Sequence, residues 1–224
     1  MARDYSAPER QRLDLERKRN LRANYDRILI VTEGSKTEPN YFREILTEYR
    51  LNTANIQIHP SGLGTQPLQV VDYAHDLFLH GDTHKRIGRR AFEQIFAVFD
   101  RDDHPTYFQA LDKAEALDGK LRNDLKQPVR FQAVASIPCF ELWLLLHFED
   151  IQAPFQRDEV LRRLSRHIPG YTKGSDNIFA RTKPLAPTAV SRADRLCARF
   201  SAYDDPSPHT DVGALVNLLM HIRQ

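Results

Sequence analysis

The chain has 224 residues, of which 41% are hydrophobic, and this is enough to bury one substantial core with a small appended subdomain. The chain has 32 Lys and Arg residues and 30 Asp and Glu residues, which gives a net charge of +2. This total does not argue for nucleic-acid binding, so any such argument must rest on how the charges are distributed. The longest apolar stretch, residues 139–148, is interrupted by Glu141 and His147 and is too short to span a bilayer, so no membrane partner is expected.

The first 27 residues are polar and charged and do not resemble a signal peptide. They predict a charged N-terminal arm outside the core, either a solvated tail, which we favour, or a contact for nucleic acid. Cys139 and Cys197 lie far apart and neither has a CxxC partner. This fits a reducing, cytoplasmic location and argues against a zinc site built on cysteines.

Strands and helices alternate from residue 28 onward. Apolar runs predict strands at 28–32, 56–59, 94–99 and 129–135, and helical spacing predicts helices at about 39–51, 66–79 and 107–121. Strands that are separated by helices of this length need crossover connections, and these produce a mostly parallel sheet. The pattern therefore predicts an α/β fold with helices on the faces of the sheet.

The last third of the chain is mainly helical by its spacing. A helix containing Trp143 follows Ile137-Pro138, and further helices are expected at about 157–168, 187–200 and 210–222. Residues 169–186 are rich in Gly, Lys and Pro and predict a loop. We expect three parts: the arm of residues 1–27, a core of residues 28–150, and a C-terminal extension of residues 151–224 packed on that core.

Two of the predicted strands end in acidic residues. Glu33 follows the first strand, and Asp100 and Asp102 end or follow the third strand along the chain. Because ligands bind at the carboxyl ends of parallel strands, we expect these three carboxylates within a few ångströms of one another. Asp100 and Asp102 would project to one side if the strand continued through them. Such carboxylates suit Mg²⁺ or Mn²⁺, although acids at strand ends also serve as turn and helix-cap residues.

Other side chains carry a functional and a structural alternative. Gly34 and Lys36 lie in a predicted strand-to-helix turn, where the backbone can approach a phosphate and Lys36 is either a phosphate ligand or a solvated side chain. Glu141 interrupts an apolar helix and needs a partner or a metal, unless it caps the helix. His104 is expected to be a structural turn residue, and His147 a core histidine.

Four segments resemble the RloB/AbiLii family, which is found in phage-defence loci beside an AAA-type ATPase. They are ILIVTEGSKTEPNYF, VFDRDDH, IPCFELWLLLHF and TDVGALVNLL, and they span most of residues 28–220. The Glu-Gly and Asp-x-Asp strand ends also look like the toprim domain of topoisomerases, primases and related nucleases. The resemblance implies a toprim-like (Rossmann-like) core with a helical C-terminal part.

The resemblance also implies roles for individual residues. Glu33 would act as acid, base or metal-positioning group, and Asp100 and Asp102 would bind the metal, with Asp103 assisting. Glu141 would be a further ligand or base. Lys173 matches a basic family position, so that with Gly34 and Lys36 it would bind substrate.

The expected function is therefore that of a divalent-metal-dependent nuclease in bacterial anti-phage defence. It would cleave phosphodiester bonds of RNA, such as tRNA, or of DNA. We expect a partner ATPase and consider a homo-oligomer. The alternative is a non-catalytic metal-binding or regulatory module that docks on an AAA-type ATPase. The residues alone do not separate the two, and the choice of RNA as substrate rests on analogy with other toprim toxins.

Overall fold

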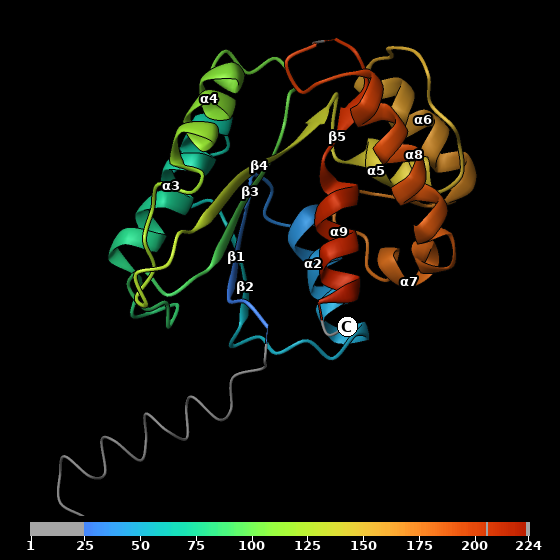
Figure 1. Cartoon of the computed structure of the whole chain (residues 1–224). Helices are drawn as coiled ribbons and strands as arrows, with labels where there is room; N and C mark the ends of the chain where they lie inside the picture. Colours follow the sequence, from blue (N-terminus) through green and yellow to red (C-terminus); the bar gives the residue numbers. More distant parts are fainter. Residues whose placement is uncertain (1–24, 205, 223–224) are drawn as a thin grey trace, which may run out of the picture.

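The computed structural model describes residues 25–204 and 206–222, and a five-stranded sheet lies at its centre (Figure 1). The strands occur in the order β2-β1-β3-β4-β5. Their bounds are β1 Ile28–Thr32, β2 Ile56–Pro60, β3 Gln94–Asp100, β4 Arg130–Ile137 and β5 His209–Thr210. The first four strands are parallel and β5 pairs antiparallel with the end of β4. The predicted α/β fold with a mostly parallel sheet is confirmed, although the short β5 was not predicted as a strand and its Thr210 was assigned to the start of a helix.

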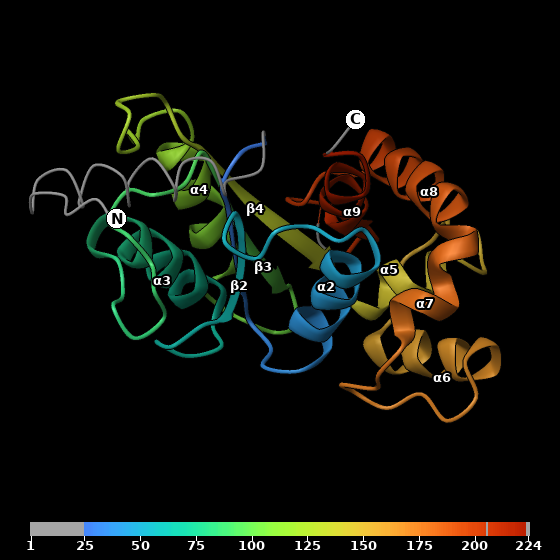
Figure 2. The same ribbon diagram turned by 90° about the horizontal axis from the view of Figure 1, so that it is seen from below.

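Helices cover both faces of the sheet (Figure 2). On one face lie α3 (Pro67–His80) and α4 (Tyr107–Leu117), and on the other lie α2 (Thr37–Glu48) and α9 (Val212–His221). The strand β1 shows why both faces are needed, because all five of its residues are buried. Ile28 and Ile30 belong to the core beneath α2, whereas Leu29 and Val31 belong to the core beneath α3, as alternation along a strand requires.

The remaining helices extend the α2 side of the molecule. They are α5 (Glu141–Leu146), α6 (Arg157–His167), α7 (Ile178–Thr182) and α8 (Ala186–Arg199), with a 3₁₀ turn at Lys183–Leu185 between the last two. The prediction of a loop throughout residues 169–186 is wrong for its second half. Ile178 and Phe179 are buried against the core and fix a short helix there, a tertiary effect that the local Gly and Pro content does not reveal.

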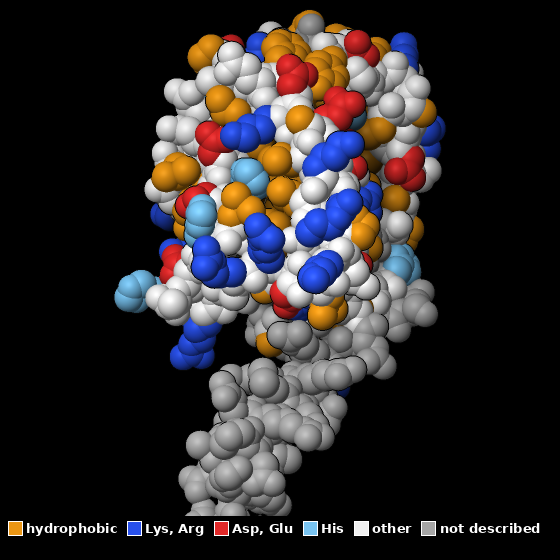
Figure 3. Space-filling model, turned by 60° about the vertical axis from the view of Figure 1, so that its left-hand side comes forward, with side chains coloured by type: hydrophobic (Ala, Val, Ile, Leu, Met, Phe, Trp, Pro, Cys, Tyr) orange, Lys and Arg blue, Asp and Glu red, His pale blue; other side chains and the backbone are white. Residues whose placement is uncertain are grey.

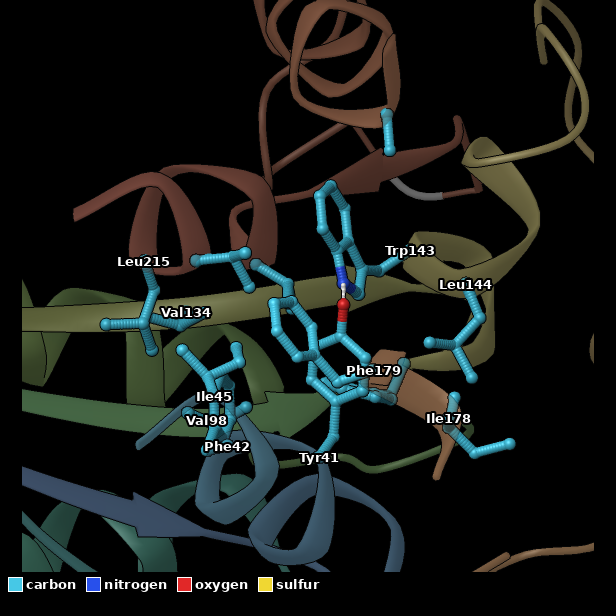
Figure 4. Close-up of a cluster of buried hydrophobic side chains, with 14 of the residues drawn as sticks. Tyr41, Phe42, Ile45, Val98, Val134, Trp143, Leu144, Ile178, Phe179 and Leu215 are labelled. Atoms are coloured by element: carbon cyan, nitrogen blue, oxygen red, sulfur yellow. Dashed lines mark hydrogen bonds between the residues drawn. The ribbon is translucent and has the colours of Figure 1, made fainter. Parts of the chain in front are cut away.

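A cluster of buried aromatic side chains joins the sheet to these C-terminal helices (Figure 4). The indole Nε1 of Trp143 on α5 donates a hydrogen bond of 2.9 Å to the hydroxyl of Tyr41 on α2. The ring of Phe179 packs edge-on against Tyr41, with 5.6 Å between the ring centroids. The same hydrophobic cluster contains Val134 of the sheet and Leu215 of α9. Residues on either side of the expected boundary at residue 150 therefore share one core.

Most of the predicted N-terminal arm lies outside the described residues. In the described end of the arm Asp26 is exposed, whereas Arg27 is buried, with only 6% of it exposed. The Arg27 guanidinium forms ion pairs with Glu93 and with Asp124, the latter at 2.5 Å. Among the described helices, none has both the length and the apolar character that crossing a bilayer requires.

The positive charges of the protein are unevenly distributed over its surface. Figure 3 shows Lys and Arg side chains gathered on the side of the molecule that α3 and α4 cover. The loop after α3 contributes the exposed residues Lys85, Arg86 and Arg89. The protein therefore has a locally basic surface, although its net charge is only +2.

Candidate functional site

The carboxyl ends of β1 and β3 form the floor of a crevice. Thr32 is in register with Val98, and the Glu33 N–H continues the ladder by donating to the Val98 carbonyl at 2.9 Å. Glu33 Oε2 in turn accepts a 2.9 Å hydrogen bond from the Asp100 N–H. A cavity of about 220 Å³ opens above these residues. Its lining comprises Glu33, Gly34, Ser35, Lys36, Thr37, Glu38, Thr65, Asp100, Phe140, Glu141, Arg157 and Lys173.

Asp102 and His104 approach Glu33 from the turn that follows β3. One ligand atom from each of Glu33, Asp102 and His104 lies within 4.8 Å of the other two, and His104 Nε2 is 3.4 Å from Glu33 Oε1. The strand ends at Asp100, so it does not continue through Asp102, and the predicted placement of both side chains on one side of a strand does not apply. Asp102 instead adopts a left-handed conformation with φ of 32°, a region in which Asp is enriched among non-glycine residues. His104, which we expected to be structural, is part of this group.

Two buried acids complete a carboxylate cluster, by which we mean Glu33, Glu38, Asp100, Asp102 and Glu141. Glu141 is the first residue of α5 and is 2% exposed, and its Oε1 accepts a 3.2 Å hydrogen bond from the Tyr171 hydroxyl. Glu38 lies in the first turn of α2 and is 7% exposed. We did not predict Glu38 as a site residue. Its position beside Pro39, at the start of an apolar helix, was a signal in the sequence that could have identified it.

Gly34 allows the Glu38 carboxylate to reach the crevice. A Cβ atom at residue 34 would lie 2.3 Å from Glu38 Oε2, so another side chain there would displace this carboxylate from its present position. The glycine therefore leaves room for the Glu38 carboxylate. Our expectation that Gly34 lets the backbone approach a phosphate is not tested by this contact.

Three carboxylates of the cluster, those of Glu33, Glu38 and Asp100, have a raised pKa. Burial raises the pKa of Asp100 well above its usual range, and the charges of Glu38, Glu33 and Glu141 raise it further. Burial likewise raises the pKa of Glu33, against the lowering effect of the Asp100 N–H and of His104. It also raises the pKa of Glu38, to which Glu141 and Glu33 add their repulsion. A cation in the crevice would offset this repulsion.

Basic side chains surround the cluster. Arg157, the first residue of α6, forms an ion pair with Asp102, and its Nη2 lies 3.8 Å from Asp100 Oδ2. Nothing in the sequence near residue 157 indicated this role, because the contact spans 55 residues along the chain. Arg157 shows that the crevice attracts positive charge, and its planar guanidinium suits a phosphate as well as a carboxylate.

Lys36 and Lys173 come together because their two segments are hydrogen-bonded. The Gly174 N–H donates to Thr37 Oγ1 at 3.0 Å, and the Asn40 side-chain amide donates to the Gly174 carbonyl at 3.5 Å. Both lysines line the cavity. The structure thus brings together all of the predicted site residues except Asp103, which is exposed and lines the neighbouring hollow with His104.

Comparisons with known proteins identify a family. A family model described as RloB-like protein matches residues 28–219. This range includes the sheet, the carboxylate cluster and the C-terminal helices. Comparisons with curated proteins and with solved structures gave no match.

Proposed function

Because this chain belongs to the RloB-like protein family, we propose that it is a divalent-metal-dependent nuclease with a toprim-like core that acts in bacterial anti-phage defence. The observation that carries the proposal is the carboxylate cluster at the carboxyl ends of β1 and β3, with Lys36, Arg157 and Lys173 on the walls of the same cavity. Phosphodiester cleavage needs carboxylates that hold a cation and positively charged side chains that bind the phosphate oxygens.

The residues fit Mg²⁺ or Mn²⁺. Asp100 and Asp102 would hold the ion, with Glu33 beside it, since these hard cations prefer carboxylate oxygens and retain several waters. The fit rests on buried, mutually repelling acids, because burial raises the pKa of Glu33, Glu38 and Asp100 and the charges of neighbouring acids raise it further. A bound ion of this kind supplies the charge that stabilises the phosphoryl group as it gains negative charge.

The protein's own groups would bind and orient the substrate. Lys36 and Lys173 neutralise the phosphate, and the N–H groups that open α2, a helix of 12 residues, point at the same oxygens. Arg157 exchanges its carboxylate partner for a phosphate oxygen when substrate arrives. The basic surface on the α3–α4 side adds contacts to a long polyanion.

Glu33 is the proposed general base. Burial raises its pKa towards neutrality, which makes the carboxylate a better proton acceptor than an exposed glutamate. Its Oε2 is fixed by the Asp100 N–H, so Oε1, beside His104, is the oxygen that takes the proton of the attacking water. The proposed substrate class is RNA, such as tRNA. The proposed partner is an AAA-type ATPase, and the proposed location is the cytoplasm.

A cleavage assay tests the proposal. The purified protein is incubated with total RNA and with plasmid DNA, in Mg²⁺, in Mn²⁺ and in chelator. We expect metal-dependent cleavage that Asp100→Asn abolishes without unfolding the protein, since this change removes a costly buried charge. The matched control is Asp150→Asn, an exposed residue paired with Arg195, which should cleave normally.

Two results would contradict the proposal in different ways. Full activity of Asp100→Asn would mean that the cleavage site lies elsewhere. Metal binding that depends on Asp100, without cleavage of either nucleic acid, would favour the non-catalytic module that docks on an ATPase.

A further inference from the structure

A second group of metal-ligating side chains lies where the end of α8 meets β5. Cys197 is in the last turn of α8, His209 begins β5, and Asp211 follows it. One ligand atom from each of the three lies within 4.8 Å of the other two. None of these residues belongs to the carboxylate cluster, and the proposed nuclease activity does not use them.

The imidazole of His209 is oriented as a metal ligand would be. Its Nδ1 lies 3.0 Å from the Phe200 carbonyl oxygen, so Nδ1 carries the proton and donates it. The lone pair is then on Nε2, which is buried in a residue only 4% exposed and has no hydrogen-bond partner within the part of the chain that the structure describes. A backbone carbonyl on the other ring nitrogen is the usual support for a metal-bound histidine.

Asp211 and Cys197 present their donor atoms to this nitrogen. Asp211 Oδ2 accepts a 3.1 Å hydrogen bond from the Ala135 N–H, which leaves Oδ1 3.0 Å from His209 Nε2. This contact does not have the alignment of a hydrogen bond. Cys197 is exposed, with Sγ 3.4 Å from the Thr210 carbonyl oxygen, so an ion can enter from solvent.

The arrangement differs from a catalytic Cys-His-Asp triad. In a triad the acid accepts a hydrogen bond from one ring nitrogen while the nucleophile uses the other. Here Asp211 faces Nε2 and the Phe200 carbonyl occupies Nδ1. The donor atoms therefore converge on one point.

We propose that Cys197, His209 and Asp211 bind one Zn²⁺ ion, with solvent completing a tetrahedral shell. Zinc accepts this combination of thiolate, imidazole and carboxylate, and sites with three protein ligands keep the fourth position open. The lack of a CxxC motif argues only against a site built on paired cysteines. A donor set drawn from a helix and a strand leaves no such spacing in the sequence.

The ion would hold together elements that support the carboxylate cluster. Asp100 is in register with Ser136 of β4, and Ser136 is in register with Thr210 of β5. The spacing between strands places the backbones of Asp100 and Thr210 roughly 10 Å apart across the sheet. Zinc would fasten α8, β5 and the start of α9 to β4, so its expected role is structural.

A proton is the competing occupant of Nε2. Burial lowers the pKa of His209, but Asp211 and Cys197 outweigh it and raise the pKa to about 10. A protonated His209 would form an ion pair with Asp211 and leave Cys197 a free thiol. The experiment must therefore detect the sulfur as a ligand.

The test is titration of the metal-free, full-length protein with Co²⁺ and with Zn²⁺. A thiolate bound to Co²⁺ gives an intense charge-transfer absorption in the near ultraviolet, which a site made of oxygen ligands does not give. We expect this absorption in the unaltered protein, its loss when Zn²⁺ displaces Co²⁺, and its absence in Cys197→Ser. His209→Gln should weaken Co²⁺ binding at least tenfold.

Two controls separate this site from others. Cys139→Ser, at the buried cysteine, should keep the absorption, and so should Asp100→Asn, which disables the carboxylate cluster. Zn²⁺ should also raise the melting temperature of the unaltered protein and leave that of Cys197→Ser unchanged. Absence of the absorption in the unaltered protein, or its persistence in Cys197→Ser, would overturn the proposal, and the first of these results does not depend on any variant folding.

Discussion

At the scale of residues, the carboxylate cluster combines acids held by different local contacts. The Asp100 N–H fixes Glu33, and the Tyr171 hydroxyl contacts Glu141. Arg157 pairs with Asp102 from a different helix. Each contact orients one oxygen and leaves the other for the crevice, so the acids are positioned before any ligand binds. Positioning of this kind is what a metal or phosphate site requires.

Glu141 is the acid for which a functional and a structural role can be separated most clearly. We predict that Glu141→Gln weakens metal binding or cleavage at least tenfold, about 1.4 kcal/mol, because it removes one charge from the cluster. Thermal stability should be kept, since glutamine still accepts from Tyr171 and relieves repulsion. Calorimetric metal titration and a melting curve on one sample check both expectations.

Glu149→Gln is the matched control for this change. Glu149 lies beyond the end of α5 and pairs with Arg163 and with His167, the latter at 2.8 Å, away from the crevice. Its variant should lose some stability and keep its metal affinity. If Glu141→Gln instead kept its metal affinity and melted earlier, Glu141 would be a core hydrogen-bonding residue.

His147 gives a prediction about pH. Burial lowers its pKa to about 4, from about 6.5 in an unfolded chain. Between these values the unfolded state binds a proton that the folded state does not, so the free energy of unfolding falls as the pH falls. The contribution of neutral His147 to the free energy of unfolding is complete above pH 6.5. It declines by about 3 kcal/mol as the pH falls towards 4.

Urea unfolding at a series of pH values across this window measures the contribution. The slope of stability against pH should be smaller in His147→Gln than in the unaltered protein. His80→Gln, at an exposed histidine whose side chain is 62% accessible, should keep the original slope. Equal slopes in all three proteins would show that His147 does not titrate in this window.

At the scale of elements, the positions of Lys36 and Lys173, the lysines proposed to bind substrate, depend on the contact between the start of α2 and the loop of residues 169–177. Gly174 has φ of +82°, and a Cβ there would lie 2.8 Å from Lys36 Cβ. Gly170 in the same loop has φ of +75°, with open space around it. The two glycines share the same backbone requirement and differ in what surrounds them.

We predict that Gly174→Ala releases this loop and Gly170→Ala does not. Both changes force a left-handed alanine, at roughly 1–2 kcal/mol. Only the change at residue 174 should also separate the Gly174 N–H from Thr37, and trypsin should then cleave faster after Lys173. Melting curves and timed proteolysis of both variants check this, and equal proteolysis would contradict it.

At the scale of the whole molecule, the aromatic cluster makes the sheet and the C-terminal helices mutually dependent. Tyr41 and Trp143 are buried and come from opposite ends of the core segment, while Phe179 and Leu215 come from the C-terminal part. Neither part can bury its apolar surface without the other. The molecule should therefore unfold as a unit, although the sequence suggested a boundary near residue 150.

We predict that Tyr41→Phe lowers the free energy of unfolding by about 1–3 kcal/mol, because the buried Trp143 N–H loses its acceptor. Tyr49→Phe makes the same chemical change on a half-buried ring and should cost less. Fluorescence of Trp143, the only tryptophan, and far-ultraviolet circular dichroism should report coincident transitions. A fluorescence transition that precedes the circular-dichroism transition would mean that the C-terminal helices unfold separately.

The sequence by itself determined the four parallel strands and the edge of the sheet at which Glu33 and Asp100 meet. Buried strands and amphipathic helices are local patterns, and parallel strands must place Glu33 and Asp100 at the same edge. Tertiary structure alone decided the rest. Arg157 and Tyr171 contact acids of the carboxylate cluster from distant parts of the chain. Cys197 and His209 come together where α8 meets β5, and Ile178 and Phe179 form α7 by packing on the core. Local periodicity records which face of an element is buried, whereas the neighbour that meets that face is set by the packing of the whole chain.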